Sequence, residues 1–143
     1  MAKKILIAEN DKKIALPLAI HLRAAGYDVI AAPDAVLAMS MALKHQPDLI
    51  VLDTRMPGGN GFLVAKWIQD LEGMIGVPLI FLAASRQPGL REKARKLGAV
   101  AFFEHPYDVE ELLATIQQTL GDPASSYRET LDDPVGYYVL SAN

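Results

Sequence analysis

The sequence predicts an α/β domain of the (βα)₅ type, with a parallel five-stranded sheet between two layers of helices. Short continuous apolar runs recur along the chain, and such runs are typical of strands that are buried on both faces of a parallel sheet. Longer segments between these runs carry apolar residues at helical spacing. Because connections between parallel strands are right-handed, this alternation places helices on both faces of the sheet.

Five segments have the composition of buried strands. Each is a short apolar run, and only the second contains a charged residue, Asp28. We therefore predict strands at residues 5–8, 28–31, 49–52, 79–82 and 100–103.

Five helices are predicted from apolar residues that recur every three or four positions. The residues that define them are Ile14, Leu18, Leu22 and Ala25; Val36, Met39 and Leu43; Leu63, Trp67, Ile68 and Leu71; Leu90, Ala94 and Leu97; and Leu112, Leu113, Ile116 and Leu120. The expected helix ends are Gly26, Gly73, Gly98 and Gly121. Pro17 lies inside the first helix, where we expect a kink at a cost of roughly 3 kcal/mol.

The composition narrows the class of protein. The 143-residue chain is 51% hydrophobic and 22% charged, which is typical of a folded domain. It has no cysteine, which excludes disulfides, thiolate metal sites and cysteine nucleophiles. A net charge of −3 does not favour nucleic acid or an anionic membrane as a partner. The run at residues 5–8 is too short for a signal peptide or a membrane span, so we expect a cytoplasmic protein.

A change of composition predicts a domain at residues 1–120 and a C-terminal tail at residues 121–143. The whole net charge of −3 lies in the tail, where one base is outnumbered by the acids Asp122, Glu129, Asp132 and Asp133. The apolar stretch at residues 135–140 is expected to dock on the domain or on a neighbouring subunit. Within the domain, the basic run at residues 86–96 is interpreted as a solvated helix face.

Polar side chains follow two of the predicted strands. Glu9, Asn10 and Asp11 come after the first strand, and Asp53 comes after the third. In open α/β sheets, ligands bind beyond the carboxyl ends of the strands. Oxygen ligands without a thiolate suit a hard cation such as Mg²⁺. Asp11 has an alternative role as a helix N-cap, whereas Asp53 ends a buried strand and has no helix to cap.

Four blocks of the sequence resemble the CheY-like receiver domain of two-component response regulators. They are residues 4–11, 47–61, 77–84 and 97–106, and the most specific is the turn that begins Asp53-Thr54-Arg55-Met56-Pro57. The resemblance implies a flavodoxin-like sheet with strand order 2-1-3-4-5. It also implies that the site aspartate takes a phosphoryl group from a kinase phosphohistidine, with Mg²⁺ bound.

Several positions match the site of that family. The resemblance implies that Asp53 is the phospho-acceptor, that Glu9 reaches Mg²⁺ through water, and that the backbone carbonyl of Arg55 is a metal ligand. Phe102 occupies the aromatic switch position, where a role as a core aromatic is favoured at least as strongly. A cis peptide bond between His105 and Pro106, which directs His105 toward Asp53, is also implied.

Three positions depart from the family. Asn10 stands where the family has a metal-binding aspartate, so the affinity for Mg²⁺ is expected to fall. Ala83 stands where a serine or threonine hydroxyl contacts the phosphoryl group. His105 stands at the lysine position, and a histidine is mostly neutral above pH 7 whereas a lysine keeps its charge. Together the departures predict a degenerate receiver with a weakened metal site.

Two functions follow from the resemblance. The first is a receiver that is phosphorylated on Asp53 by a sensor histidine kinase or phosphotransfer protein and signals to a downstream effector through a surface change. The alternative is a pseudo-receiver, a protein-interaction module that works without phosphorylation. A haloacid-dehalogenase-type phosphatase needs an aspartate where Arg55 stands, and no enzymatic activity toward an external substrate is expected.

A homodimer is also expected, through the face formed by the fourth helix, the fifth strand and the fifth helix. This face resembles the dimerisation and output surface of the family. Across a two-fold axis it would pair the bases Arg91, Arg95 and Lys96 with the acids Asp108, Glu110 and Glu111.

Overall fold

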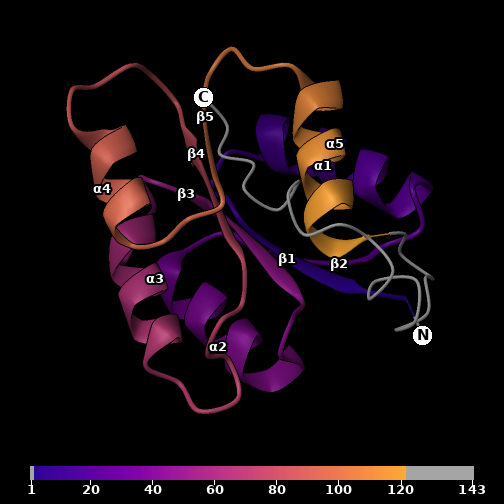
Figure 1. Ribbon diagram of the computed structural model, residues 1–143, viewed down its shortest axis with the longest axis horizontal. Coiled ribbons are helices and arrows are strands. Elements are labelled where there is room, and N and C mark those ends of the chain that lie inside the picture. The colour runs from indigo at the N-terminus through magenta and orange to yellow at the C-terminus, as the bar shows by residue number, and fades with distance from the viewer. Residues whose placement is uncertain (1, 122–143) are drawn as a thin grey trace.

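A computed structural model describes residues 2–121; the tail beyond them, with its expected docking stretch, lies outside the described residues. Strands and helices alternate along the chain (Figure 1). The strands are β1 (Lys4–Ala8), β2 (Asp28–Ala32), β3 (Leu49–Asp53), β4 (Leu79–Ala83) and β5 (Ala101–Glu104). The helices are α1 (Lys12–Ala24), α2 (Ala35–His45), α3 (Gly61–Gln69), α4 (Leu90–Lys96) and α5 (Val109–Leu120). Within residues 2–121, every helix is too short or too polar to span a membrane.

The strands form one parallel sheet in the order β2-β1-β3-β4-β5, which confirms the expected topology. Figure 1 shows α1 and α5 on one side of the sheet and α2, α3 and α4 on the other. The helices that follow the neighbouring strands β1 and β3 thus lie on opposite faces. At such a switch point the loops after the two strands diverge, and a crevice opens beyond their carboxyl ends.

Two apolar cores bury the sheet, one on each face. Ile5 and Ile7 belong to the core beneath α1 and α5, whereas Leu6 and Ala8 belong to the core beneath α2, α3 and α4. Successive side chains of a strand point to opposite faces, so a strand with a core on both sides is apolar at every position. This explains the continuous apolar runs in the sequence.

The ends of several elements differ from the predicted ones by a few residues. β3 and β4 extend to Asp53 and Ala83, so both residues are the last of their strands. Helix α1 continues through Pro17 to Ala24. Helix α2 ends without a glycine, because Gln46 adopts the left-handed conformation with φ 46° and its N–H bonds to a carbonyl of the last turn.

Side-chain caps fix where four of the helices around the carboxyl edge begin. Asp11 caps α1, Asp34 caps α2, Asn60 caps α3 and Asp108 caps α5, each by accepting a hydrogen bond from a backbone N–H of the first turn. Helix α4 is different, since it follows Gly89 at φ 86° and has no side-chain cap. Its position therefore depends on contacts with its neighbours.

The end of α5 is fastened to the opposite, amino-terminal edge of the sheet. The ammonium group of Lys3 donates a hydrogen bond to the carbonyl of Leu120 at 2.6 Å. The hydroxyl of Tyr27 donates to the carbonyl of Gly121 at 3.2 Å. These bonds fix the place where the chain leaves the described domain.

Candidate functional site

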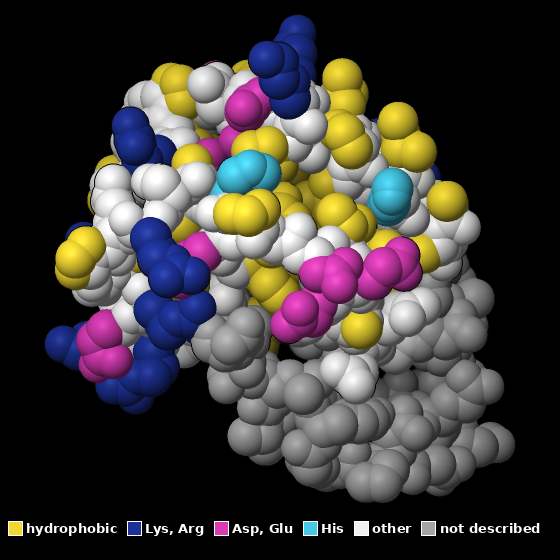
Figure 2. Space-filling model, turned by 90° about the horizontal axis from the view of Figure 1, so that it is seen from above, with side chains coloured by type: hydrophobic (Ala, Val, Ile, Leu, Met, Phe, Trp, Pro, Cys, Tyr) yellow, Lys and Arg dark blue, Asp and Glu magenta, His cyan; other side chains and the backbone are white. Residues whose placement is uncertain are grey.

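The carboxyl ends of β1, β3, β4 and β5 bring the predicted site residues to one edge of the sheet. Glu9 follows β1, Asp53 and Ala83 end β3 and β4, and His105 follows β5. Figure 2 looks onto this edge and shows a row of acidic side chains on one part of it, basic side chains with a few acids among them on another part, and two histidines beside exposed apolar side chains. Basic, acidic and apolar side chains therefore all lie on this edge, together with the predicted acids Glu9 and Asp53.

Glu9 and Asp53 form a buried pair of acids. Glu9 is 5% exposed and Asp53 is 7% exposed, and their carboxyl groups are hydrogen-bonded to each other. Burial, followed by the hydrogen bond and the negative charge of Asp53, raises the pKa of Glu9 from its ordinary value of 4.5 to about 8. The backbone N–H of Asp11 donates to Glu9 Oε2 at 3.1 Å and opposes this shift. The pair therefore holds a proton in neutral solution, in a place that a cation would also suit.

The turn after β3 holds the Asp53 carboxylate in one orientation. The backbone N–H of Arg55 donates to Asp53 Oδ1 at 3.1 Å, so the carboxylate leans over the start of the loop. The loop returns at Gly61, where a Cβ atom would lie 2.2 Å from the Asp53 carbonyl oxygen. Only glycine fits such a close approach. Both contacts depend on the turn that begins with Asp53.

The other predicted metal-site residues lie around this pair. Asn10 is exposed in the middle of the loop after β1. Asp11 caps α1 and its carboxylate is exposed, which confirms its interpretation as an N-cap. The side chain of Arg55 is exposed, so any contribution to a metal site comes from its backbone. Among residues 2–121, no cluster of three or more acidic or histidine side chains has the geometry to hold a metal ion.

The positions expected to contact a phosphoryl group are occupied by a methyl group and an imidazole. Ala83 is buried at the end of β4. The expected cis peptide bond between His105 and Pro106 is present. The His105 ring lies edge-on to Tyr107, with ring centroids 6.1 Å apart, and both line a cavity of about 170 Å³ against α1. Within the described residues, His105 makes no hydrogen bond or ion pair with Asp53.

Tyr107 is a residue of this edge that the sequence analysis did not identify. Burial, together with the negative charges of Glu9 and Asp53, raises the pKa of its hydroxyl to about 12. The phenol is therefore neutral and close enough to sense the acid pair. Its position directly after the expected cis proline could have indicated that the Tyr107 side chain lies near the acid pair.

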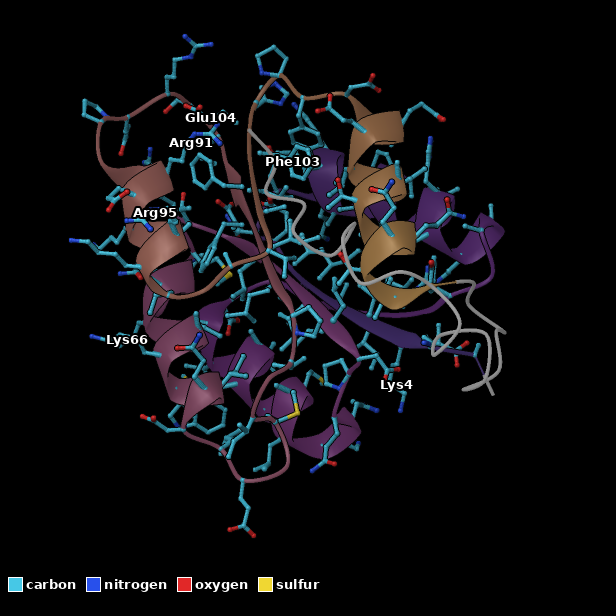
Figure 3. All side chains as sticks on the ribbon, viewed as in Figure 1. Lys4, Lys66, Arg91, Arg95, Phe103 and Glu104 are labelled. Atoms are coloured by element: carbon cyan, nitrogen blue, oxygen red, sulfur yellow. The ribbon has the colours of Figure 1, made fainter. Side chains whose placement is uncertain are left out.

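Phe102 is buried beneath a cation from α4. The guanidinium carbon of Arg91 lies 4.9 Å from the centre of the Phe102 ring, and Arg91 also forms an ion pair with Glu104 at 3.2 Å. Figure 3 shows Arg91 and Glu104 pointing toward each other from α4 and β5. Lys93 of the same helix lies 5.0 Å from the Phe62 ring. The basic run is therefore more than a solvated face, because two of its cations pack on aromatic rings.

Comparisons with known proteins agree on a single family. The family model described as the response regulator receiver domain matches residues 5–117. The polar-differentiation response regulator DivK of Brucella ovis is 31% identical over 122 residues, which cover 85% of this chain and 99% of DivK.

Solved structures resemble the fold closely. The chemotaxis protein CheY4 of Vibrio cholerae is 28% identical with a TM-score of 0.77, covering 84% of this chain and all of that one. The receiver domain of the sensor histidine kinase PA1611 from Pseudomonas aeruginosa is 27% identical with a TM-score of 0.74, covering 82% of this chain and 97% of that one. That structure has a magnesium ion coordinated in its active-site cleft.

Proposed function

Because the chain belongs to the response regulator receiver domain family of two-component signalling, we propose that Asp53 accepts a phosphoryl group with Mg²⁺ bound beside it. The donor is a sensor histidine kinase or a phosphotransfer protein, and the resulting surface change acts on a downstream effector. In this role the chain is a signalling module of the cytoplasm and not an enzyme toward an external substrate. The receiver domain spans residues 1–120, followed by the tail at residues 121–143.

The observation that carries the proposal is the buried acid pair. Glu9 and Asp53 share a hydrogen bond in a buried place, where two negative charges are unfavourable unless a proton or a cation lies between them. Mg²⁺ prefers carboxylate, carbonyl and water oxygens. The residues that would hold it are Glu9, Asp53, the backbone carbonyl of Arg55 and the amide oxygen of Asn10. When bound, Mg²⁺ supplies positive charge next to the oxygens of the transferring group.

The transfer itself needs little from the protein beyond position and charge. An Asp53 carboxylate oxygen forms a bond to phosphorus while the bond from phosphorus to the donor's imidazole nitrogen breaks, and that nitrogen keeps the electron pair. The Arg55 N–H orients the carboxylate through Oδ1, which leaves Oδ2 available for the attack. The donors expected at positions 83 and 105 are weak or missing, so we expect slow transfer and a low yield.

The test is incubation with acetyl phosphate and Mg²⁺, followed by intact-mass measurement. The expected result is a partial gain of one phosphoryl mass that disappears in Asp53→Asn. Asp48→Asn is a matched control, because this acid lies at the other edge of the sheet, where it accepts a hydrogen bond from the Lys4 backbone N–H. An unchanged mass with acetyl phosphate and with a phosphorylated histidine kinase would contradict the proposal.

A pseudo-receiver is the second candidate, and one arrangement favours it. Phe102 is buried beneath Arg91, which is tied to Glu104, and Ala83 has no hydroxyl that could draw the β4–α4 loop toward Asp53. The α4–β5 surface is then the same with or without a phosphoryl group. In that case Asp53→Asn binds the effector as tightly as the wild-type protein does.

A further inference from the structure

Thr54 carries a buried hydroxyl group without a hydrogen-bond partner. The residue is 3% exposed, and its Oγ1 is the one buried side-chain oxygen or nitrogen within residues 2–121 that makes no hydrogen bond. Buried hydroxyls are nearly always paired, because an unpaired one loses its bonds to water without replacement. This unpaired hydroxyl lies one residue along the chain from the proposed phospho-acceptor. Leaving it unpaired costs free energy in the folded state, so we look for a partner that it gains when the protein functions.

The sheet places Thr54 beside Ala83. Asp53 lies opposite Leu82 in the β3–β4 pairing, and the Thr54 N–H donates to the Leu82 carbonyl at 2.9 Å, so the pairing continues one residue past β3. Registered residues of parallel strands point to the same face. Ala83 belongs to the core beneath α2, α3 and α4, so Thr54 faces that side as well. Its hydroxyl is therefore level with the methyl group that replaces the hydroxyl expected at position 83.

The Asp53 carboxylate leans toward this part of the chain. Its Oδ1 accepts the hydrogen bond from Arg55 N–H, which draws the carboxylate back over the peptide between Thr54 and Arg55. The Gly61 N–H in turn approaches the Thr54 carbonyl at 3.4 Å, which closes the loop around this peptide. The Asp53 side chain itself starts toward the other face, opposite Leu82, and the Arg55 bond to Oδ1 holds its carboxylate over the carboxyl end of the sheet. A group joined to Oδ2 is therefore held at this edge, one residue along the chain from Thr54.

We propose that Thr54 supplies the hydroxyl that binds the phosphoryl group on Asp53, in place of the missing hydroxyl at position 83. This inference rests on the proposed function of Asp53. Oγ1–H donates to a phosphoryl oxygen after a turn of the side chain, and no covalent bond changes. Because the hydroxyl has no partner in the resting protein, it gives up no hydrogen bond when it turns. The cost in the resting state is thereby recovered in the phosphorylated state.

The test compares Thr54→Val, which keeps the shape and removes the hydroxyl, with Thr54→Ser, which keeps the hydroxyl. The probe is beryllium fluoride with Mg²⁺, which imitates a phosphoryl group on a carboxylate, and its affinity is measured by calorimetry. We expect Thr54→Val to bind it roughly tenfold more weakly, as when one hydrogen bond to a charged group is lost. Thr54→Ser keeps an affinity close to that of the wild type. Ser85→Ala is the matched control, because it removes an exposed hydroxyl after β4 and is expected to change nothing.

Unfolding in urea without the probe separates binding from structure. Loss of an unpaired hydroxyl leaves the free energy of unfolding of Thr54→Val equal to or above that of the wild type. A clear fall would show that the hydroxyl has a partner in the resting protein and would overturn the inference. Equal probe affinities of wild type and Thr54→Val, or weakening in Ser85→Ala instead, would also overturn it and leave the proposed function intact. A wild-type protein that gains no phosphoryl mass and binds no probe would contradict both the proposed function of Asp53 and the role of Thr54.

Discussion

The raised pKa of Glu9 makes the stability of the folded protein depend on pH. This pKa is about 8 in the folded protein and near 4.5 for an ordinary glutamate, so the folded state binds a proton more tightly than the unfolded state does. A group of this kind favours folding fully below about pH 4.5, and that contribution is lost as the pH rises through about 8.

We therefore expect the free energy of unfolding to fall between about pH 5 and about pH 8, and Glu9→Gln to remove most of that fall. Urea denaturation at several pH values measures it. Glu72→Gln, which changes an exposed acid after α3, should leave the slope as it is in the wild type. A wild-type protein with equal stability across this range would contradict the shift assigned to Glu9.

The double variant Asn10→Asp with His105→Lys tests the charge deficit of the site. It restores one metal-binding carboxylate and one permanent cation, so we expect a higher affinity for Mg²⁺ and a higher yield of phosphorylation from acetyl phosphate. Calorimetry and intact mass measure the two quantities. A wild type that is phosphorylated as readily as the double variant would show that the charge argument is wrong.

For single residues, the sequence predicts which residues lie at the site better than it predicts what their side chains contact. Glu9 and Asp53 were predictable because each follows a buried apolar strand and matches a family motif. The raised pKa of Tyr107 and the unpaired Thr54 hydroxyl were not, because both depend on what packs around a side chain. A hydroxyl beside a strand end has the same sequence signature whether it is paired or not.

Helix α4 depends on its neighbours for stability more than the other helices do. It spans only Leu90–Lys96 and begins without a side-chain cap, so neighbouring elements hold it in place. Arg91 contacts Phe102 and Glu104 of β5, and Lys93 contacts Phe62 of α3. The helix is thus attached on both sides by cations of its own basic run.

We expect Arg91→Gln to lower the free energy of unfolding by about 1 kcal/mol, since a partly exposed ion pair and a cation–ring contact are each modest. Amide hydrogen exchange in α4 should become faster, while exchange in α3 stays the same. Arg95→Gln is the matched control, because among residues 2–121 Arg95 forms an ion pair only with Glu92 of the same exposed helix face. Equal exchange in both variants would show that Arg91 does not attach α4.

Element order and type were predictable because the apolar periods of strands and helices differ. The ends of the elements were less predictable. Helix α2 ends at His45 because the next residue, Gln46, adopts the left-handed conformation, which the hydrogen bond from its N–H to the last turn stabilises. The packing of α4 cations on aromatic rings has no local sequence signal, since Arg91 and Phe102 are distant in the chain.

On the whole molecule, charge is separated across the face formed by α4, β5 and α5. Basic side chains project from α4, and Asp108, Glu110 and Glu111 project from the start of α5. Arg91 and Glu111 also line one hollow between these elements. A two-fold axis through this face would bring each charged helix against its opposite in a second copy.

A homodimer that forms this way should weaken with salt, because exposed ion pairs are screened. Sedimentation velocity at about 0.05 M and about 0.5 M salt measures the change. Glu111→Lys should give the monomer at both salt concentrations, whereas Glu72→Lys, away from this face, should behave as the wild type does. A wild type that is monomeric at low and high salt would rule out this dimer.

The exit point of the chain decides how the molecule can be presented to a partner. Lys3 and Tyr27 hold Leu120 and Gly121 at the amino-terminal edge of the sheet, a strand's length, roughly 16 Å, from the edge that carries Asp53. A biotin tether attached at Gly121 therefore anchors the domain from the side opposite its acid pair. On a sensor chip, every immobilised copy would offer the Asp53 edge to the flowing solution, so candidate kinases could be ranked by their dissociation rates.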